Sequence, residues 1–149
     1  MSDIEALADR FAIQDLIAEY PVIVDSGKLD ALDHLFTADA HLDFTGFGGP
    51  DGTLADVKEF LGKTLPMFAK TQHMMGLPLI SLNAHTATSR TSCHNPMLMA
   101  KPDGGHQAWL IGLWYDDEFV KTADGWRFAA RKATRCYSVV GLDDTPLSG

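Results

Sequence analysis

Apolar residues in the first part of the chain recur every three or four positions, which is the spacing of a helix with one buried face. These positions are Ile4, Leu7, Ala8, Phe11, Leu16, Ile17 and Tyr20. Ser2 or Asp3 can cap the helix at its start. Pro21 lacks an amide hydrogen and is expected to kink or interrupt it. The pattern therefore predicts a long amphipathic helix with a single buried stripe.

Shorter elements are predicted between this helix and the middle of the chain. Residues 25–27 (Asp-Ser-Gly) are typical of a turn, and residues 28–36 have the apolar spacing of a short helix. Residues 41–44 alternate like a brief strand, and the glycine-rich residues 46–52 predict a loop. A third helix is expected over about residues 53–68.

The second half of the chain changes to the period of strands. Four runs rich in β-branched and aromatic residues cover residues 71–82, 86–99, 107–122 and 125–140, and short turn sequences separate them. Helices followed by an antiparallel meander are typical of an α+β domain and not of βαβ alternation. The sequence therefore predicts one α+β domain over residues 1–149.

The end of the chain and the cysteines add little to this fold. Residues 141–149 are expected to form a loosely held tail. Cys93 and Cys136 could pair, but two cysteines in 149 residues do not make a disulfide framework. We expect both to be free thiols of a cytoplasmic protein, because the acidic N-terminal residues also show no secretory signal.

Composition and charge exclude several classes of function. A formal net charge of −8, with only twelve Lys and Arg residues, argues against a nucleic-acid partner. No stretch approaches the roughly 20 apolar residues of a membrane span. None of the six histidines stands at a metal-binding spacing such as H-x-x-x-H. The sequence therefore predicts no metal site, no nucleic-acid partner and no membrane partner.

Four segments in a fixed order resemble the SnoaL-like branch of the nuclear transport factor two-like (NTF2-like) superfamily, which includes scytalone dehydratase and bile-acid 7α-dehydratase. They are Tyr20 with Asp25 five residues later, His73 within Thr-Gln-His-Met-Met-Gly, Cys93-His94 after Thr-Ala-Thr-Ser-Arg, and Tyr115-Asp116-Asp117-Glu118-Phe119 leading to Arg131. The resemblance implies a cone-shaped domain with a strongly curved, mainly antiparallel sheet wrapped around three to four N-terminal helices. It also implies a pocket for a small hydrophobic ligand, and a homo-oligomer, either dimer or trimer.

The same resemblance implies a catalytic pair. In the dehydratases the residues that match Asp25 and His73 act together, and a carboxylate on one imidazole nitrogen leaves the other nitrogen as an acceptor for a substrate proton. Tyr20 is a candidate to polarise a substrate carbonyl. Its place on the apolar stripe is equally consistent with a buried tyrosine that makes one hydrogen bond.

The remaining site candidates lie on the predicted strands. His94 is a candidate general acid, but strand alternation turns it away from Asn95 unless Pro96 marks a bulge. Asn95 and Tyr115 are candidate substrate-binding residues. Arg135 could clamp a carboxylate or a thioester-linked tail, or form a salt bridge to the acidic helices.

We expect a cofactor-independent lyase or isomerase, dehydratase-like in its chemistry, acting on a hydrophobic, carbonyl-containing substrate. Two other classes of function fit the same fold. One is a non-catalytic ligand-binding domain. The other is an assembly partner that resembles the small subunit of ring-hydroxylating dioxygenases. The Tyr20, Asp25 and His73 set favours the enzyme.

Overall fold

The computed structural model describes residues 2–143, and it confirms the predicted α+β class. Its elements are α1 (Asp3–Ser26), η1 (Leu29–His34), β1 (Phe36–Asp43), η2 (Thr45–Phe47), β2 (Asp51–Gly52), α2 (Leu54–Thr64), η3 (Leu65–Met67), β3 (Lys70–Thr71), β4 (Met74–Met75), β5 (Leu79–Asn83), β6 (Thr86–Ala100), β7 (His106–Thr122) and β8 (Gly125–Asp143). The η elements are short 3-10 helices. The helices come mainly first and the long strands last, as the sequence predicts.

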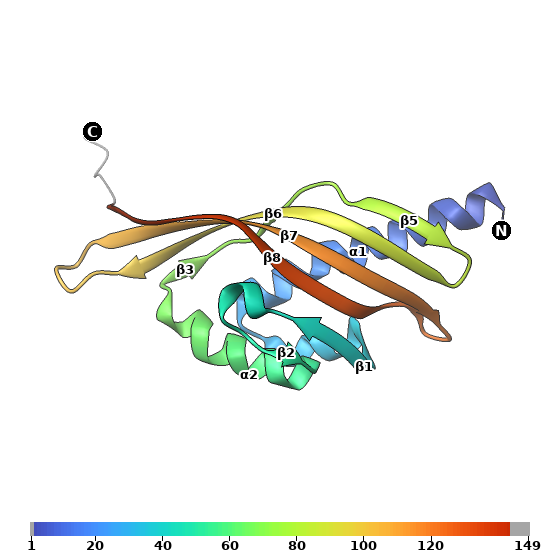
Figure 1. Cartoon of the computed structure of the whole chain (residues 1–149), viewed down its shortest axis with the longest axis horizontal. Helices are drawn as coiled ribbons and strands as arrows, with labels where there is room; N and C mark the ends of the chain where they lie inside the picture. The colour runs from blue at the N-terminus through green and yellow to red at the C-terminus, as the bar shows by residue number, and fades with distance from the viewer. Residues whose placement is uncertain (1, 144–149) are drawn as a thin grey trace.

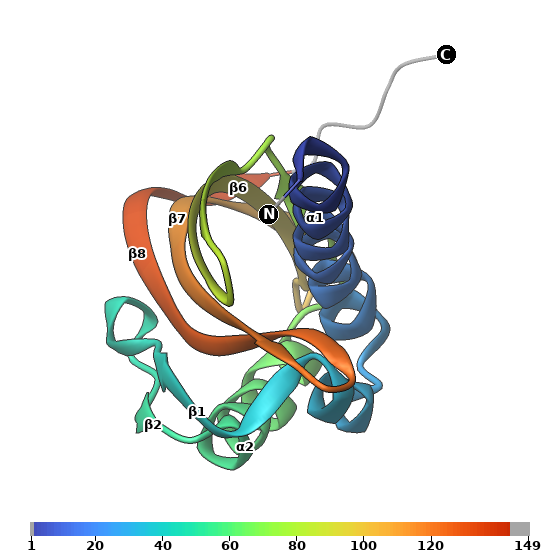
Figure 2. The ribbon, with the colours of Figure 1, turned by 90° about the vertical axis from the view of Figure 1, so that its right-hand side faces the viewer.

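One 8-stranded sheet dominates the fold, in the order β2-β1-β8-β7-β6-β3, with β4 and β5 also paired to β6. Its long strands β6, β7 and β8 are antiparallel, and only β1 joins β8 in parallel. Figures 1 and 2 show that the sheet curves strongly, with α1 and α2 on the same side of it. The predicted curved and mainly antiparallel sheet is therefore present.

The first helix is capped at both ends, and Pro21 does not break it. The Ser2 side chain accepts from the backbone N–H of Glu5, whose carboxylate accepts from Ser2, which forms a capping box. The helix runs through Pro21 to Ser26, and Gly27 ends it with a left-handed φ of 74°. The expected interruption at Pro21 is wrong, because the surrounding turns are buried in the core and hold the helix together.

The predicted apolar stripe is buried only in the second half of α1. Ile4, Leu7 and Phe11 are exposed, since this end of the helix extends beyond the packed core (Figure 1). The buried Asp9 nevertheless anchors it, because its carboxylate lies 2.8 Å from Lys121 Nζ and accepts from Trp126 Nε1 at 2.8 Å. A buried carboxylate with two such partners is stable where an unpaired one would not be.

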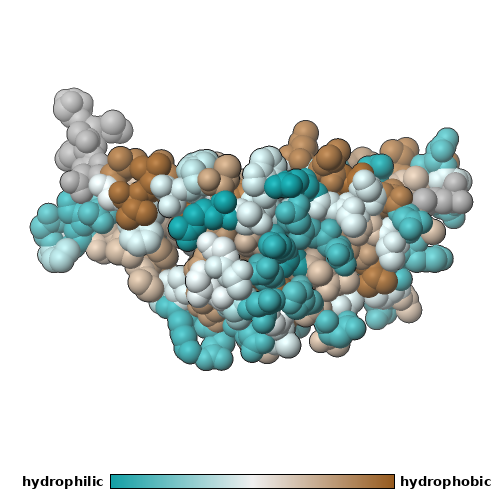
Figure 3. Space-filling model, viewed as in Figure 1, coloured by the Kyte–Doolittle hydropathy of each residue, from teal (hydrophilic) through white to brown (hydrophobic). Residues whose placement is uncertain are grey.

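The strand predicted over residues 71–82 is divided into β3, β4 and β5, all paired with β6. Residues 72 and 73, between β3 and β4, belong to no strand. At the other end of the chain, residues 141–143 of the predicted tail belong to β8, and the rest of that tail lies outside the described residues. Figure 3 shows hydrophobic surface at this end of the sheet, where Val139, Val140 and Leu142 are exposed.

The register of β6 decides which of its side chains face the helices. β6 pairs with β7 without a shift from Thr86↔Val120 to Ala100↔His106, so Pro96 causes no bulge. Burial alternates along the strand, and Asn95 and Met97 are buried with the core residues. Asn95 therefore faces the helix side of the sheet and His94 faces the opposite side.

Candidate active site

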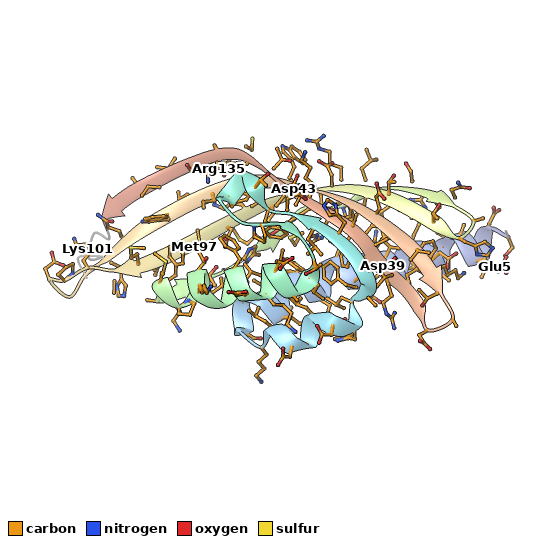
Figure 4. All side chains as sticks on the ribbon, turned by 60° about the horizontal axis from the view of Figure 1, so that its bottom comes forward. Glu5, Asp39, Asp43, Met97, Lys101 and Arg135 are labelled. Atoms are coloured by element: carbon orange, nitrogen blue, oxygen red, sulfur yellow. The ribbon has the colours of Figure 1, made fainter. Side chains whose placement is uncertain are left out.

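A cavity of about 200 Å³ lies between the sheet and the helical layer formed by α2 and η3. Its walls are mainly aromatic and aliphatic, and they include Phe44, Phe60, Phe68, Met97 and Leu113. Figure 4 labels Met97, which belongs to β6, and Arg135, which belongs to β8. Such an apolar cavity with a few polar groups is the usual form of a small-molecule site.

The polar group at one wall of this cavity is His73, which is bound twice by Asp25. His73 Nδ1 lies 2.6 Å from Asp25 Oδ1, and the backbone N–H of His73 donates to Asp25 Oδ2 at 2.8 Å. The two side chains are only 10% and 21% exposed. Because a carboxylate only accepts hydrogen bonds, Nδ1 carries the ring proton and Nε2 is left with a free lone pair.

Asp25 holds this position at some electrostatic cost. It lies in the last turn of α1, where the helix dipole disfavours a negative charge, and no basic residue lies in that turn. The two hydrogen bonds to His73 offset this repulsion. Such a local conflict between a charge and the helix dipole is expected at functional sites, so the position of Asp25 is consistent with a functional role.

Asn95 lines the cavity and also fixes the segment that carries His73. Its amide nitrogen donates to Thr71 Oγ1 and to the backbone carbonyl of Gln72, both at 3.0 Å. The backbone N–H of Gln72 in turn donates to the carbonyl of Pro96 at 3.1 Å. These bonds hold the unpaired residues between β3 and β4 against β6, and they leave only the side-chain oxygen of Asn95 for a ligand.

Tyr115 lines the cavity, whereas Tyr20 lies behind it in the core. The two rings meet edge to face with centroids 5.8 Å apart, and Tyr20 is 1% exposed. Burial raises the pKa of Tyr20 to about 12 and raises that of Tyr115 well above its ordinary value. Tyr20 therefore does not contact a ligand in the cavity, and the alternative of a buried core tyrosine describes it better than a carbonyl-polarising one.

A buried ion pair that the sequence did not predict supports both tyrosines. Arg131 is 1% exposed, and its Nε and Nη2 donate to the two oxygens of Asp117 at 2.7 and 2.8 Å. Its guanidinium carbon lies 4.2 Å from the Tyr20 ring centroid and 4.1 Å from that of Tyr115. The partner Asp117 is the residue of β7 that faces Arg131, so strand register alone could have suggested this ion pair.

His94 does not line the cavity. It lies on the opposite face of β6, where its Nδ1 is 2.6 Å from the Tyr137 hydroxyl. Gly112 makes room for this pair, since a Cβ at that position would lie 2.0 Å from the Tyr137 ring. Side chains alternate along β6 without a bulge, and His94 therefore points away from the cavity. The expectation that His94 lies in the pocket as a general acid is wrong.

Arg135 lies at the cavity, on the same face of β8 as the buried Arg131. Its guanidinium carbon is 5.1 Å from the ring centroid of Phe47, a residue of η2. Sequence reasoning missed Phe44 and Phe47 as cavity residues, because neither the brief strand predicted over residues 41–44 nor the glycine-rich loop after it indicated that these rings face a cavity.

A larger hollow of about 600 Å³ lies on the other face of the sheet, but it lacks a comparable constellation. Its charged residues form ion pairs, such as Arg90 with Asp116 at 3.7 Å and Lys132 with Asp43 at 3.6 Å. Within residues 2–143, no three His, Cys, Asp or Glu side chains are grouped to hold a metal ion. In the same part of the chain no helix has the length and apolar character of a membrane span.

Together, the curved sheet over N-terminal helices and the hydrogen-bonded His–Asp pair at an apolar cavity have the form of an NTF2-like domain. Residues 5–132 match the family model of the SnoaL-like domain. The chain therefore belongs to the SnoaL-like family.

Sequence relatives cover almost the whole chain. An uncharacterized protein of Mycobacterium tuberculosis is 39% identical over 137 residues, which are 92% of each chain. Gamma-hexachlorocyclohexane dehydrochlorinase of Sphingobium indicum is 31% identical over 152 residues, covering 100% of this chain and 90% of the enzyme.

Solved structures share the fold over similar lengths. The crystal structure of LinA superposes with a TM-score of 0.83 at 25% identity, covering 98% of this chain and 99% of that one. A putative scytalone dehydratase from Novosphingobium aromaticivorans has a TM-score of 0.79 at 18% identity, covering 97% and 96%. The sequence relatives of this chain thus include a dehydrochlorinase, and the putative scytalone dehydratase shares its fold.

Proposed function

We propose that this protein is a cofactor-independent lyase or isomerase in which His73 removes a proton from a carbon atom of a small hydrophobic substrate. The observation that carries the proposal is the pair of hydrogen bonds from Asp25 to His73, with the imidazole at the wall of an apolar cavity. A base held in one tautomer and shielded from bulk water meets the geometric requirements of general-base catalysis.

The proposed reaction begins when His73 Nε2 takes a proton from the substrate carbon. The electrons of that C–H bond form a new double bond, and Asp25 stabilises the imidazolium that results. In an elimination, the leaving group departs from the neighbouring carbon with its bonding electrons. In an isomerisation, His73 returns the proton to another carbon. Asn95 supports both reactions by keeping the His73 segment in place.

The choice between these reactions depends on whether the cavity contains a group that can donate a proton to the leaving group. Within residues 2–143, no second histidine and no carboxylic acid line the cavity, and the raised pKa of Tyr115 makes it a poor proton donor. Asparagine cannot protonate a leaving group. The cavity therefore favours an isomerisation or the loss of a halide, which needs no proton. Loss of hydroxide requires protonated His73 itself to serve as the acid.

The relatives support this proton-abstraction chemistry. The dehydrochlorinase name describes loss of hydrogen chloride, in which a proton and a chloride leave the substrate. The apolar lining suits a hydrophobic substrate. Tyr115 is the proposed donor to a carbonyl group, and the side-chain oxygen of Asn95 is proposed to accept a hydrogen bond from a donor group of the substrate. We further propose that the protein functions as a dimer or trimer without a cofactor.

The experiment compares the wild-type protein with His73→Gln on a panel of hydrophobic substrates in D₂O. The panel contains β-hydroxy ketones, β,γ-unsaturated ketones and γ-hexachlorocyclohexane. NMR detects deuterium exchange, loss of water or movement of a double bond, and an ion electrode detects chloride release. We expect at least one reaction with the wild type, and its loss in His73→Gln with ligand binding retained. Full activity in the variant contradicts the mechanism. Binding without turnover of any panel member identifies a ligand-binding domain instead.

A further inference from the structure

The side chains of residues 2–143 that line the cavity include a positively charged group but no negatively charged one. No aspartate or glutamate is among the described residues that line it, although the whole chain has a net charge of −8. Apart from His73, whose charge Asp25 can balance, the lining contains one ionic side chain, Arg135. A ligand in this cavity therefore meets a cation that the cavity walls do not neutralise.

The two arginines on the inner face of β8 differ in their partners. Arg131 is neutralised by the two hydrogen bonds to Asp117. Arg135 forms no ion pair and no hydrogen bond with any residue in the described range 2–143, and it stacks only on Phe47. Arg90, Lys121, Arg131 and Lys132 of the sheet each have a carboxylate partner, whereas Arg135 has none among the described residues and is available to bind a ligand.

The position of Arg135 beside the cavity is built by close packing of η2 on β8. A Cβ at Gly46 would lie 2.9 Å from the backbone carbonyl oxygen of Ala133 and 3.5 Å from the backbone nitrogen of Arg135. Only glycine allows this approach without moving the strand. The approach brings Phe47 under the guanidinium, and such stacking orients Arg while leaving its N–H groups free to donate.

A second free donor lies in the same cavity wall. The indole N–H of Trp109 is buried and has no hydrogen-bond partner among the described residues. An unsatisfied buried donor is unfavourable, and a ligand acceptor would satisfy it. The wall formed by β7 and β8 thus offers hydrogen-bond donors, whereas His73 on the β4 side offers an acceptor. Strands β6 and β7 lie between β4, which follows His73, and β8, which carries Arg135, so these two residues are roughly 14 Å apart along the sheet at ordinary strand spacing.

We propose that the substrate carries a carboxylate, or a chemically equivalent anionic group, and that Arg135 binds this group at the side of the cavity opposite His73. The inference rests on the proposed function, because it assumes that the carbon acid lies at His73. The carboxylate serves as a handle remote from the reacting carbon, since a negative charge next to that carbon would oppose its deprotonation. Arg135 thereby selects anionic hydrophobic molecules over neutral ones of the same shape.

The test measures binding of 3-phenylpropanoate and of its neutral isostere 3-phenylpropanamide by calorimetry at low ionic strength. The proteins are the wild type, Arg135→Gln, Arg135→Lys, His73→Gln and the control Arg90→Gln, which removes an arginine from the other face of the sheet. We expect the wild type to bind the carboxylate about tenfold or more tightly than the amide. Arg135→Gln should lose this preference, Arg135→Lys should keep part of it, and the other two variants should keep it fully.

Three results would overturn the inference. They are equal affinity of the wild type for the acid and the amide, a carboxylate preference that survives in Arg135→Gln, and no detectable binding of the acid at millimolar concentration. Thermal unfolding of each variant shows whether Arg135→Gln is folded, which its exposed position favours. If the preference depends on Arg135 but no substrate in the panel reacts, the anion site stands and the proposed lyase or isomerase activity fails.

Discussion

Replacing Asp25 with asparagine changes the chemistry of the site without changing its shape. Both contacts of Asp25 are with donors, the ring Nδ1–H and the backbone N–H of His73. An asparagine has one acceptor and one donor group in the same positions. If its oxygen keeps the backbone bond, its NH₂ faces Nδ1 and forces the ring proton onto Nε2. If its oxygen faces Nδ1 instead, its NH₂ opposes the backbone N–H of His73.

The size of the effect follows from these two contacts. A hydrogen bond to a charged group contributes about 1.5–3 kcal/mol, and each 1.4 kcal/mol corresponds to a factor of ten. Loss of one such bond to the imidazolium therefore slows the reaction about 10- to 150-fold. The fraction of rings in the wrong tautomer lowers the rate further, so we expect a total loss of about 100- to 10,000-fold, in the range of general-base catalysis.

Two measurements check this expectation. Long-range ¹H–¹⁵N correlation NMR of the neutral ring should show the proton on Nδ1 in the wild type and a substantial share on Nε2 in Asp25→Asn. Turnover of a substrate from the panel should fall in parallel, while Asp15→Asn, the same change at an exposed position of α1, leaves both unchanged. An Asp25→Asn variant with more than a tenth of wild-type turnover, or with the proton still on Nδ1, refutes the reasoning.

Further predictions concern stability and assembly. Asp117→Asn leaves the buried Arg131 without its counter-charge and should lower the free energy of unfolding in urea by about 3–5 kcal/mol; a loss below about 1 kcal/mol would contradict this. Hydrogen bonds from Lys121 and Trp126 lower the pKa of Asp9, so its contribution to stability is present above the unfolded pKa and is lost as the pH falls through the folded one. Urea titrations between about pH 2 and 6 should therefore show a shallower loss for Asp9→Asn than for the wild type, and equal slopes would refute the assignment. Light scattering should show a dimer or trimer, and a monomer at micromolar concentration would remove that claim.

Regular periodicity explains the parts of the fold that could be predicted. The long strands are rich in β-branched and aromatic residues and are separated by clear turn sequences, so their predicted limits agree within a few residues with β6, β7 and β8. Alternation also separated Asn95 from His94 correctly, because β6 has no bulge at Pro96. For β6, which pairs with β7 without a register shift, local sequence was therefore sufficient to predict which side chains share a face.

Tertiary packing explains what local sequence could not predict. Pro21 is tolerated inside α1 because the turns around it are buried, and burial cannot be read from the proline itself. The predicted strand over residues 71–82 is interrupted because Asp25, from a distant helix, binds the backbone N–H of His73 and takes it out of the sheet. The interruption therefore coincides with the candidate catalytic residue.

The division of polar groups across the cavity connects the two proposals. His73 offers a lone pair on the β4 side, and Arg135 and Trp109 offer donors on the wall formed by β7 and β8. A substrate bound by both sides must place a C–H bond at one end and an electron-rich group at the other. Tyr20 lies outside the lining, so it cannot hold a long-lived enolate at the His73 end. In an isomerisation, stabilisation of the enolate oxygen therefore falls to Tyr115, which lines the cavity, while the negative end of the substrate is held at Arg135.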